Sequence, residues 1–448
     1  MNHKRVMTIP SGTDYRAGRI LLLGIILFFA TAHSNSGYAQ SSTQGTIYSR
    51  FGLGERVDFS SSRSQAIGGG AWAFRSADAT NYANPAVLSD IVIFRFTAAV
   101  ELQSLTSEAT GFEDSKLSAG YLKALQLSFP LVAGKVGIGL TSTPYTRIAY
   151  HVEQSGSFET EPGDGNFLPF GSTSNGNGGL HRISSAIGYA PVKNLSIGVR
   201  ADIIFGILED VQDTSFGSPF FDDGLLTEST RLAGVSGTFG IWYRKTRFLS
   251  QGDGIYLGAT LTLPSSLTGE RIVTTGRGEL IDTLSSVNVS GIGIPLSGSL
   301  SIAYQKSSRI TLVLDALYEG WSKVNNEGSF RRFPENSIAD YRDRYRISGG
   351  VQYGGGSPNE SYSRRVLLRF GVYFDRSYIS PAVGTDINSR GLTAGISLPT
   401  VFSGTTVDMN FDIGQTGTTE NGLVRDRYFK FGFNLNFGER WFRRVKLG

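Results

Sequence analysis

Tyr428-Phe-Lys-Phe-Gly-Phe-Asn-Leu-Asn-Phe437 is the stretch of this 448-residue chain that decides its fold. Apolar side chains occupy every second position from Phe429 to Phe437, and lysine, glycine and asparagine stand between them. Because successive side chains of a β-strand point to opposite faces, this order predicts a strand with one apolar face and one polar face.

The same alternation recurs from about residue 91 to the end of the stretch above. It is clearest in 194–206, 253–265, 364–376 and 404–413. About 15 segments are expected to be strands, at 91–104, 116–130, 135–142, 145–155, 180–190, 194–206, 228–246, 253–265, 268–283, 296–306, 309–320, 341–354, 364–376, 389–398 and 404–437, the last of which holds two. The segments at 135–142 and 145–155 are also compatible with one bent strand interrupted at Pro144.

Alternation alone does not separate a soluble β-sandwich from a membrane barrel, because both have strands with one apolar face. The expected strands run for about 10 to 15 residues, which exceeds the usual 5 or 6 of soluble sheets and suits a tilted membrane crossing. Tyrosines near strand ends would form an interfacial girdle, at Tyr145, Tyr150, Tyr304, Tyr318 and Tyr428. The sequence therefore predicts an all-β chain that forms a transmembrane antiparallel β-barrel, with 14 as the expected even number of strands.

Short turns alternate with long polar stretches between the expected strands. Turns such as Gly134-Lys135 and Lys193-Asn194 would lie at the periplasmic rim. The polar stretches would be extracellular loops, at 156–178, 208–226, 321–341 and 415–425.

Residues 1–39 have the three parts of a secretory signal peptide. A basic region at 4–19 precedes the apolar core Ile20–Ala32, and Gly37-Tyr-Ala39 has the small-x-small pattern of a cleavage site. The core of about 13 residues is shorter than the 20 or so that a transmembrane helix needs. We expect the mature chain to begin at Gln40 and rank an uncleaved signal anchor second.

The composition excludes several classes of protein. The chain has no cysteine, so an exported protein of this sequence has neither disulfides nor a lipidation site. Its net charge is only +4, and no basic cluster is interleaved with aromatics, which argues against nucleic acid as a partner. No linker divides the mature chain, which favours one large closed sheet.

Two segments flank the expected barrel at 91–437. Residues 40–90 lack alternation and are rich in glycine, serine and alanine, so we expect them to form a hatch, or plug, inside the lumen. Residues 438–448 hold Trp441 and Phe442 among arginines, a composition that suits a cap at the periplasmic interface.

Four short motifs follow one another in the expected hatch: Phe51-Gly-Leu-Gly54, Ala66-Ile-Gly-Gly-Gly70, Ala77-Asp-Ala79 and Asn84-Pro-Ala86. Their order and spacing resemble the hatch of the outer-membrane long-chain fatty-acid transporter (FadL/TodX) family, with this chain as a divergent, Bacteroidetes-like member. The resemblance implies transport of a hydrophobic ligand, with Asn84, Pro85 and Ala86 bordering its exit route. The alternative is that Asn84-Pro85 is only a turn. The basic residues that meet the fatty-acid carboxylate in that family have no local motif here.

Six charged residues lie on the polar faces of the expected strands: Arg200, Asp202, Arg369, Asp375, Asp408 and Asp412. An arginine at lipid depth costs roughly 2–4 kcal/mol, so these side chains must point into the lumen. We expect them to pair with one another or with the hatch. A second possible role is to guide an amphipathic ligand.

An enzyme is not expected. Only His151 and His181 remain after signal cleavage, and neither has the spacing of a catalytic triad or a metal site. The glycine runs lack the lysine and hydroxyl of a phosphate loop. No metal and no cofactor are therefore expected.

The leading hypothesis is a monomeric barrel in the outer membrane of a Gram-negative bacterium, surrounded by lipid, that passively moves hydrophobic or amphipathic molecules such as long-chain fatty acids. Its polar lumen would be blocked by the hatch. The ligand would use an apolar pocket near extracellular aromatic residues, at Phe167, Phe170, Phe220 and Phe221. The alternative is a non-transporting barrel that serves as a structural or secretion-associated scaffold.

Overall fold

The computed structural model describes residues 45–439 except 76–78, 161–164, 219, 278–279, 308, 325–339, 357–358, 382–384, 401 and 403. The expected signal peptide, and the tail from Arg440 onwards, lie outside the described residues. Across the described ranges, no helix is long and apolar enough to cross a membrane.

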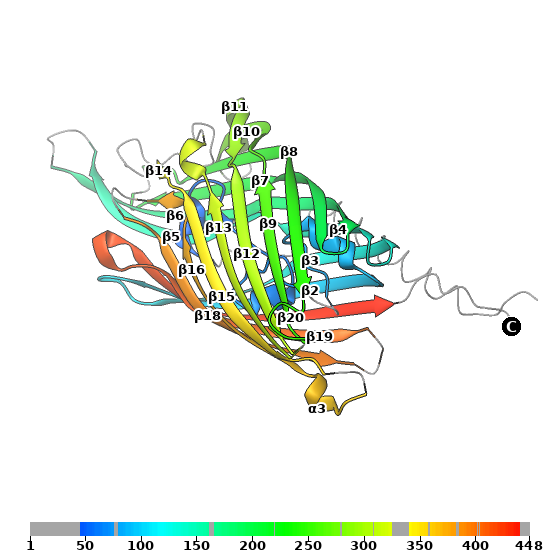
Figure 1. Cartoon of the computed structure of the whole chain (residues 1–448). Coiled ribbons are helices and arrows are strands. Elements are labelled where there is room, and N and C mark those ends of the chain that lie inside the picture. The colour runs from blue at the N-terminus through cyan, green and yellow to red at the C-terminus, as the bar shows by residue number, and fades with distance from the viewer. Residues whose placement is uncertain are drawn as a thin grey trace, which may run out of the picture. The chain divides into compact units, whose positions relative to one another are not determined.

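Strands dominate the described part of the chain (Figure 1). The wall contains β2 (Phe94–Ala109), β3 (Ser115–Val132), β4 (Val136–Pro144), β5 (Thr146–Glu159), β6 (Phe167–Val192), β7 (Leu195–Phe216), β8 (Gly224–Thr246), β9 (Gly254–Thr262), β10 (Ser265–Arg277), β11 (Leu280–Ile294), β12 (Ser297–Lys306), β13 (Ile310–Glu319), β15 (Arg344–Gly354), β16 (Leu367–Arg376), β18 (Asn388–Pro399), β19 (Thr406–Gly417) and β20 (Val424–Glu439). Shorter elements are η1 (Ile47–Arg50), β1 (Glu55–Arg56), α2 (Ser62–Gln65), η2 (Pro85–Asp90), η3 (Trp321–Lys323), β14 (Asp340–Tyr341), α3 (Tyr362–Arg365), β17 (Ile379–Ser380) and η4 (Glu420–Gly422).

Three wall strands are each interrupted once, at prolines. β4 and β5 meet at Pro144, β9 and β10 at Pro264, and β11 and β12 at Pro295. Proline has no N–H to donate to a ladder, so it breaks the regular pairing at these points. Each pair of segments is one strand, which gives the expected 14 strands.

The barrel closes because the first wall strand pairs with the last. β2 and β20 share an antiparallel ladder from Phe94 opposite Glu439 to Ala109 opposite Val424. All other wall pairings are antiparallel too. The short turns lie at the rim where β2 begins and β20 ends, so we take this as the periplasmic rim. The predicted closed, antiparallel 14-strand barrel is confirmed.

The alternation read from the sequence gives the facing of the wall residues. Phe433 and Leu435 are each 41% exposed on the outer face, whereas Asn434 and Asn436 are 2% and 1% exposed inside. On β7, Ile203 is exposed outside and Asp202 is buried inside. Apolar side chains thus meet lipid and polar side chains meet the interior.

Several expected loops are in fact strand. β5 and β6 extend through most of 156–178, β7 and β8 through most of 208–226, and β19 and β20 into 415–425. Beyond the lipid band both faces of a strand meet water or protein, so polar residues occupy both faces and the period-two pattern disappears. For a related reason β10 and β11 were expected as one strand at 268–283, whereas they are two paired antiparallel strands.

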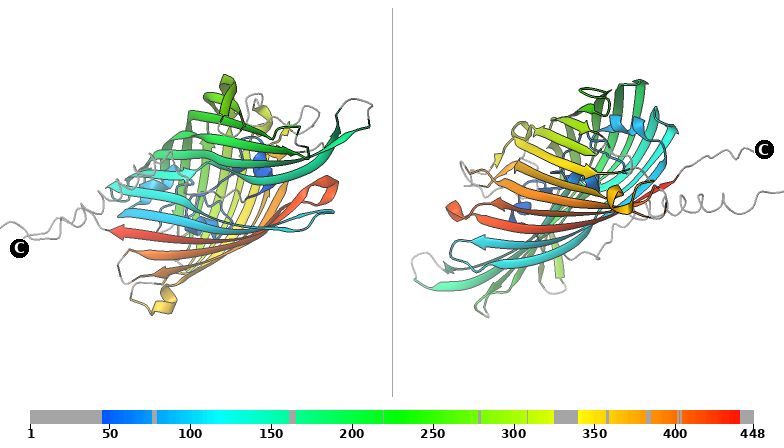
Figure 2. Two further views of the ribbon diagram at one scale, coloured as in Figure 1. Left: turned by 180° about the vertical axis from the view of Figure 1, so that it is seen from behind. Right: turned by 60° about the horizontal axis from the view of Figure 1, so that its bottom comes forward.

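The N-terminal segment, residues 45–93, lies within the ring of strands (Figure 2, blue). It holds η1, β1, α2 and η2 and little other regular structure. Three of its apolar side chains, those of Leu53, Ile67 and Phe74, are at most 1% exposed. They pack on inward-facing wall residues, which supplies the core that a segment of this size lacks by itself.

The facing of β8 predicts unequal effects of two arginine substitutions on the same strand. Phe239 is exposed on the outer face, whereas Ser236 lines an internal cavity next to Asp202. We expect Phe239→Arg to lower the free energy of unfolding in lipid by about 2–4 kcal/mol and Ser236→Arg to cost much less. Equal losses in a bilayer refolding assay would contradict this assignment of faces.

Candidate functional site

The wall of the barrel has a gap between β3 and β5. β3 pairs with β2 along almost its whole length, but with β4 only from Leu125 to Val132. β5 pairs with β6 from Ile148 to Glu159, and its other edge pairs only with the two-residue strand β1. β4 and β5 together form one bent strand. The extracellular half of the ladder between this bent strand and β3 is therefore missing in the described structure.

Local sequence explains why the strand bends here. Pro144 cannot continue the ladder, and the N–H of Tyr145 donates instead to the carbonyl of Leu180 at 2.7 Å. On the facing strand β6, Gly178 and Gly179 have φ values of 99° and 137°. Only glycine adopts such values without strain, and the two residues let β6 follow the bend away from β3.

The N-terminal segment covers the open edge of β5. Glu55 pairs with Arg147 and Arg56 with Thr146 in the β1–β5 ladder. The N–H of Ala149 donates to Ser49 Oγ at 3.1 Å. Backbone groups of β5 that would otherwise lack partners in the membrane are satisfied in this way.

Arg147 connects the two sides of the gap. Its Nη2 donates at 3.0 Å both to Glu55 of the hatch and to Gln103 of β2. Its guanidinium also lies 4.5 Å from the ring centre of Tyr121 on β3. These contacts replace the missing backbone ladder with side-chain contacts, which can separate without unpairing a strand. Arg147 was not among the residues expected from the sequence, and its only local signal is its place three residues after Pro144.

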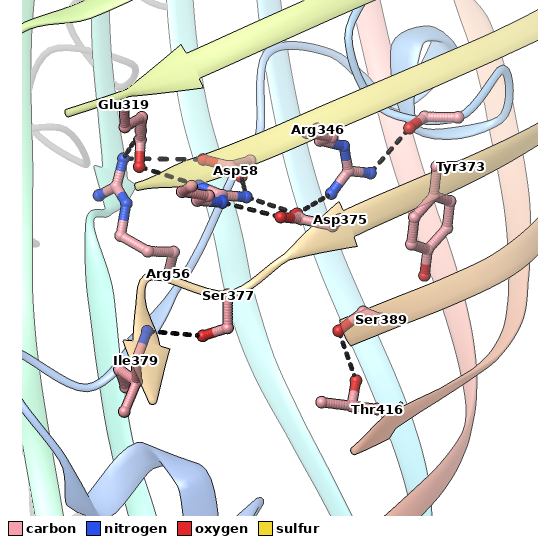
Figure 3. Close-up of polar contacts among 12 residues, drawn as sticks. Arg56, Asp58, Glu319, Arg346, Tyr373, Asp375, Ser377, Ile379, Ser389 and Thr416 are labelled. Atoms are coloured by element: carbon pink, nitrogen blue, oxygen red, sulfur yellow. Dashed lines mark hydrogen bonds and ion pairs between the residues drawn. The ribbon is translucent and has the colours of Figure 1, made fainter. Parts of the chain in front are cut away.

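A network of six alternating charges ties the hatch to the opposite wall (Figure 3). It contains Arg56, Asp58, Glu319, Arg344, Arg346 and Asp375. Arg56 lies 3.1 Å from Glu319, and Asp58 forms an ion pair with Arg344. Arg346 donates to the carbonyl of Gly68 at 2.7 Å.

The charges of this network balance, which is why they are tolerated inside. Burial by itself would raise the pKa of the Asp58 carboxyl, but the guanidiniums of Arg344 and Arg56 hold that pKa well below its usual range. Removing one partner of a buried ion pair costs about 3–5 kcal/mol, because an uncompensated charge is left behind. The network therefore holds the hatch in one position.

A second tie joins α2 to the last strands of the barrel. Arg63 Nε lies 3.3 Å from Asp408, and Ser62 Oγ donates to the same carboxylate at 2.7 Å. The side chains of Arg63 and Asp408 are both 2% exposed. Asp408 is thus a lumen charge that contacts the hatch directly.

The other five lumen charges also lie inside the barrel. Arg200 pairs with Asp202 at 2.9 Å and donates to the hatch carbonyl of Tyr82 at 3.2 Å. Asp375 belongs to the six-charge network, which reaches the hatch through Asp58 and Arg346. Arg369 and Asp412 contact wall residues instead, as Arg369 donates to Ser397 and Asp412 accepts from Tyr373.

Asn84-Pro85-Ala86 lies against a row of wall glycines. Gly137, Gly188, Gly198 and Gly240 are paired in register across β4, β6, β7 and β8. A Cβ atom on any of them would overlap Asn84, Pro85, Ala86 or Leu88. The Asn84 amide donates to the carbonyl of Ile241 at 2.9 Å, while its oxygen accepts from the Ala86 N–H at 3.0 Å. The sequence analysis did not connect these glycines, because each stands in a different strand.

The interior of the barrel towards its extracellular rim, called the upper interior, is apolar. Leu180, Ile204, Leu208, Leu232 and Leu267 are buried there on β6, β7, β8 and β10. The cluster also takes in Leu53 of the hatch and the aromatic residues Tyr150, Trp321, Tyr341 and Tyr378. The Trp321 and Tyr378 rings lie 4.3 Å apart, so the chain's own side chains fill much of this space.

Two cavities of about 150 and 120 Å³ flank the six-charge network. Arg56, Asp58 and Arg346 line both. Neither contains the aromatic residues that were expected to form a ligand pocket. Phe170 and Phe221 instead pack around Phe158 on the extracellular strands, and Phe167 and Phe220 are exposed.

The two histidines do not form a triad in the described structure. His151 is exposed and contacts Asn175 and Glu153. His181 Nε2 lies 2.7 Å from Ser142 Oγ, but within the described ranges no carboxylate or amide orients the imidazole.

The contact of Asp408 with α2 predicts that this carboxylate holds the hatch. We expect Asp408→Asn to make residues 45–93 more sensitive to protease while the barrel stays folded, because the ion pair with Arg63 is lost. Asp412→Asn is the matched control, since Asp412 accepts from the wall residue Tyr373. Equal proteolysis of both variants would show that the Asp408 contact does not hold the hatch.

The glycine row predicts a steric test of how η2 is seated. Gly198→Val should displace η2 and expose the hatch, because the new side chain would overlap Pro85 and Ala86. Gly237→Val, on a neighbouring strand with open space at its Cβ position, should leave the hatch in place. Hydrogen exchange of residues 85–90 measures the difference, and wild-type exchange in Gly198→Val would contradict it.

The chain is similar to one protein family and to several solved barrels. A family model described as BamG matches residues 21–448. No curated protein matches the chain. Among solved structures, the toluene transporter TodX of Pseudomonas putida is similar with a TM-score of 0.56 and 16% identity, over 86% of this chain and 99% of that chain.

Two further structures agree. A FadL homologue of Pseudomonas aeruginosa gives a TM-score of 0.55 at 13% identity, over 86% of this chain and 99% of that one. The monoaromatic hydrocarbon channel CymD gives 0.54 at 15% identity, over 86% and 99%. The resemblance to the FadL/TodX family is confirmed at the level of the fold. Because the BamG model matches nearly the whole chain, this protein is a member of the BamG family.

Proposed function

We propose that this protein is an outer-membrane channel through which small hydrophobic or amphipathic molecules pass without an energy source. The ligand reaches the apolar upper interior from outside the cell and leaves sideways, through the gap between β3 and β5. The hatch segment 45–56 blocks this path at rest and moves to open it.

The missing ladder between β3 and β5 is the observation that carries the proposal. A molecule that crosses a fully paired wall must break backbone hydrogen bonds inside the membrane, each of which is costly to leave unmade there. At this gap the described contacts between the two edges are those of Arg147 with Gln103 and Tyr121, while the hatch strand β1 covers the edge of β5. Movement of the hatch therefore opens a lateral path at lower cost than elsewhere.

The residues along the path suit a hydrophobic ligand. Ile148 and Tyr150 of β5 belong to the same apolar cluster as Leu180 and Leu208 of the upper interior. Arg147 would meet the carboxylate of an amphipathic ligand such as a long-chain fatty acid. Similarity to a barrel described as a toluene transporter supports aromatic hydrocarbons as a second ligand class. No step of this path requires a cofactor or a catalytic residue.

A non-transporting scaffold is the second candidate function. The observation that favours it is the filling of the upper interior by Trp321, Tyr341 and Tyr378, together with the charge network that fixes the hatch. A barrel with this interior is rigid and offers its outer and extracellular surfaces to partners.

A disulfide that locks the hatch to β5 at the gap, here called the gate disulfide, tests the transport proposal. Glu55 and Arg147 are directly opposed in the β1–β5 ladder, where Cα atoms lie about 4.5–5.5 Å apart, within reach of a disulfide. The chain has no cysteine of its own, so Glu55→Cys with Arg147→Cys gives a single, reversible lock. We expect the oxidised variant to lose uptake of a fluorescent fatty acid, and of toluene, into vesicles with lipopolysaccharide in the outer leaflet. Reduction should restore the uptake of toluene, which does not need the Arg147 guanidinium.

The matched control places a disulfide in the permanent wall, at Val136→Cys with Tyr189→Cys, which pair between β4 and β6. Its oxidation should leave uptake unchanged. Wild-type protein that gives no more uptake than empty vesicles would support the scaffold instead. Equal uptake by the oxidised and reduced gate variant would show that the ligand does not use the gap.

A further inference from the structure

The hairpin of β10 and β11 stands beyond the lipid-facing band of the barrel. β10 pairs with residues 225–234 of β8. The lipid-facing row of β8 lies further along that strand, at Val235, Phe239 and Ile241. Figure 1 shows the hairpin at the end of the barrel opposite the start of β2. It therefore lies on the extracellular side.

The outer edge of β11 is open. Within the described ranges β11 pairs only with β10, whereas β12, which continues the same strand, pairs with both β9 and β13. β13 ends at Glu319, opposite the start of β12, so it does not reach β11. Side chains 281–288 are all exposed, and nothing lies within 4 Å of the Cβ position of Gly291.

The composition of this edge is unusual for a strand in water. Residues 281–291 contain one charge, Asp282, and no lysine, arginine or proline. Ile281, Leu284 and Val287 are 73%, 58% and 55% exposed. Exposed edges are normally protected by charges, prolines, bulges or a covering element, because unpaired backbone groups recruit other strands. The register of β11 against β10 shifts at Leu284 and between Val289 and Ile292, but the stretch has one charge and no proline.

The two edges at the gap, those of β3 and β5, carry charges or a covering element. The stretch of β3 that does not pair with β4, residues 115–124, contains Lys116 and Lys123. The lower part of β5 is covered by β1, and its upper part carries His151, Glu153 and Glu159. The unpaired edge of β11, with its single charge, therefore differs from the other unpaired edges of this barrel.

We propose that the β11 edge, residues 281–291, binds an extended, largely uncharged segment of another protein by β-strand addition at the extracellular face. A row of unpaired N–H and C=O groups is complementary to an extended polypeptide and not to a lipid chain. The exposed side chains of Ile281, Leu284 and Val287 favour a segment that also carries apolar residues. The inference does not depend on whether the barrel transports a ligand.

Hydrogen exchange on the full-length protein in nanodiscs tests the proposal. The probe is a synthetic peptide of about ten alternating valine and threonine residues. In the protein alone, the outward amides of 281–291 should exchange at least about tenfold faster than the paired amides of β10. Excess peptide should slow them by about tenfold or more, with no change at β5. Absence of protection at β11 would overturn the proposal.

Two double variants identify the contact. Leu284→Lys with Val287→Lys should abolish peptide protection. Leu225→Lys with Leu226→Lys is the matched control, since it adds the same charge on β8, which lies on the other side of β10, and it should bind as wild type. Equal loss in both variants would overturn the assigned edge. If the wild-type protein forms a dimer in solution and the β11 variant does not, the occupant of the edge is a second copy of this chain. That result would overturn the assigned occupant. The exchange measurement on the wild-type protein decides the proposal even if a variant does not fold.

Discussion

Backbone hydrogen bonding inside lipid is the constraint on which the rest of this structure depends. Every N–H and C=O within the membrane needs a partner in the protein, which only a closed ladder supplies for strands. The pairing of β2 with β20 completes that ladder around the barrel. Where the ladder fails, between β3 and β5, the chain supplies other partners from its N-terminal segment. The position of the hatch is thus tied to the defect in the wall.

The hatch is held by two kinds of contact that resist movement differently. Paired charges such as Arg63 with Asp408 are stable together and costly to separate, so they fix one position. The glycine row at Gly137, Gly188, Gly198 and Gly240 allows close backbone approach and contributes van der Waals contact instead. Near the gap, most described ties come from Arg147 and the β1 pairing. Local movement at the gap is therefore compatible with a hatch that stays anchored elsewhere.

Beyond the lipid band the same strands obey different rules. Once both faces meet water, alternation is no longer required, and β6, β7 and β8 continue as polar strands of 22 to 26 residues. Their extension creates an extracellular sheet with edges that the membrane does not cover. In the described part of the chain, its edges at β3 and β5 are covered or charged, whereas that of β11 has a single charge and no covering strand.

The sequence by itself determined the class of fold. Alternation at 428–437 and strand lengths are local properties, and they were sufficient for the barrel and for the inward facing of charges such as Asp408. The strand number came from the rule that bacterial barrels have an even number of strands. The resemblance of Asn84-Pro85-Ala86 to a known hatch was also local. The extent of the extracellular strands was missed, because the pattern that identifies a strand vanishes outside lipid.

Only the tertiary structure decided the site. Asp58 and Arg344 are 286 positions apart in the chain, and they form an ion pair because closure and register bring β15 opposite the hatch. The gap depends in the same way on how far β3 and the bent strand stay paired, and the glycine row on the register of four strands. Each is a relation between residues that share no local pattern. Pairing register, which is set by the whole closed sheet, is the physical quantity that the sequence pattern did not contain.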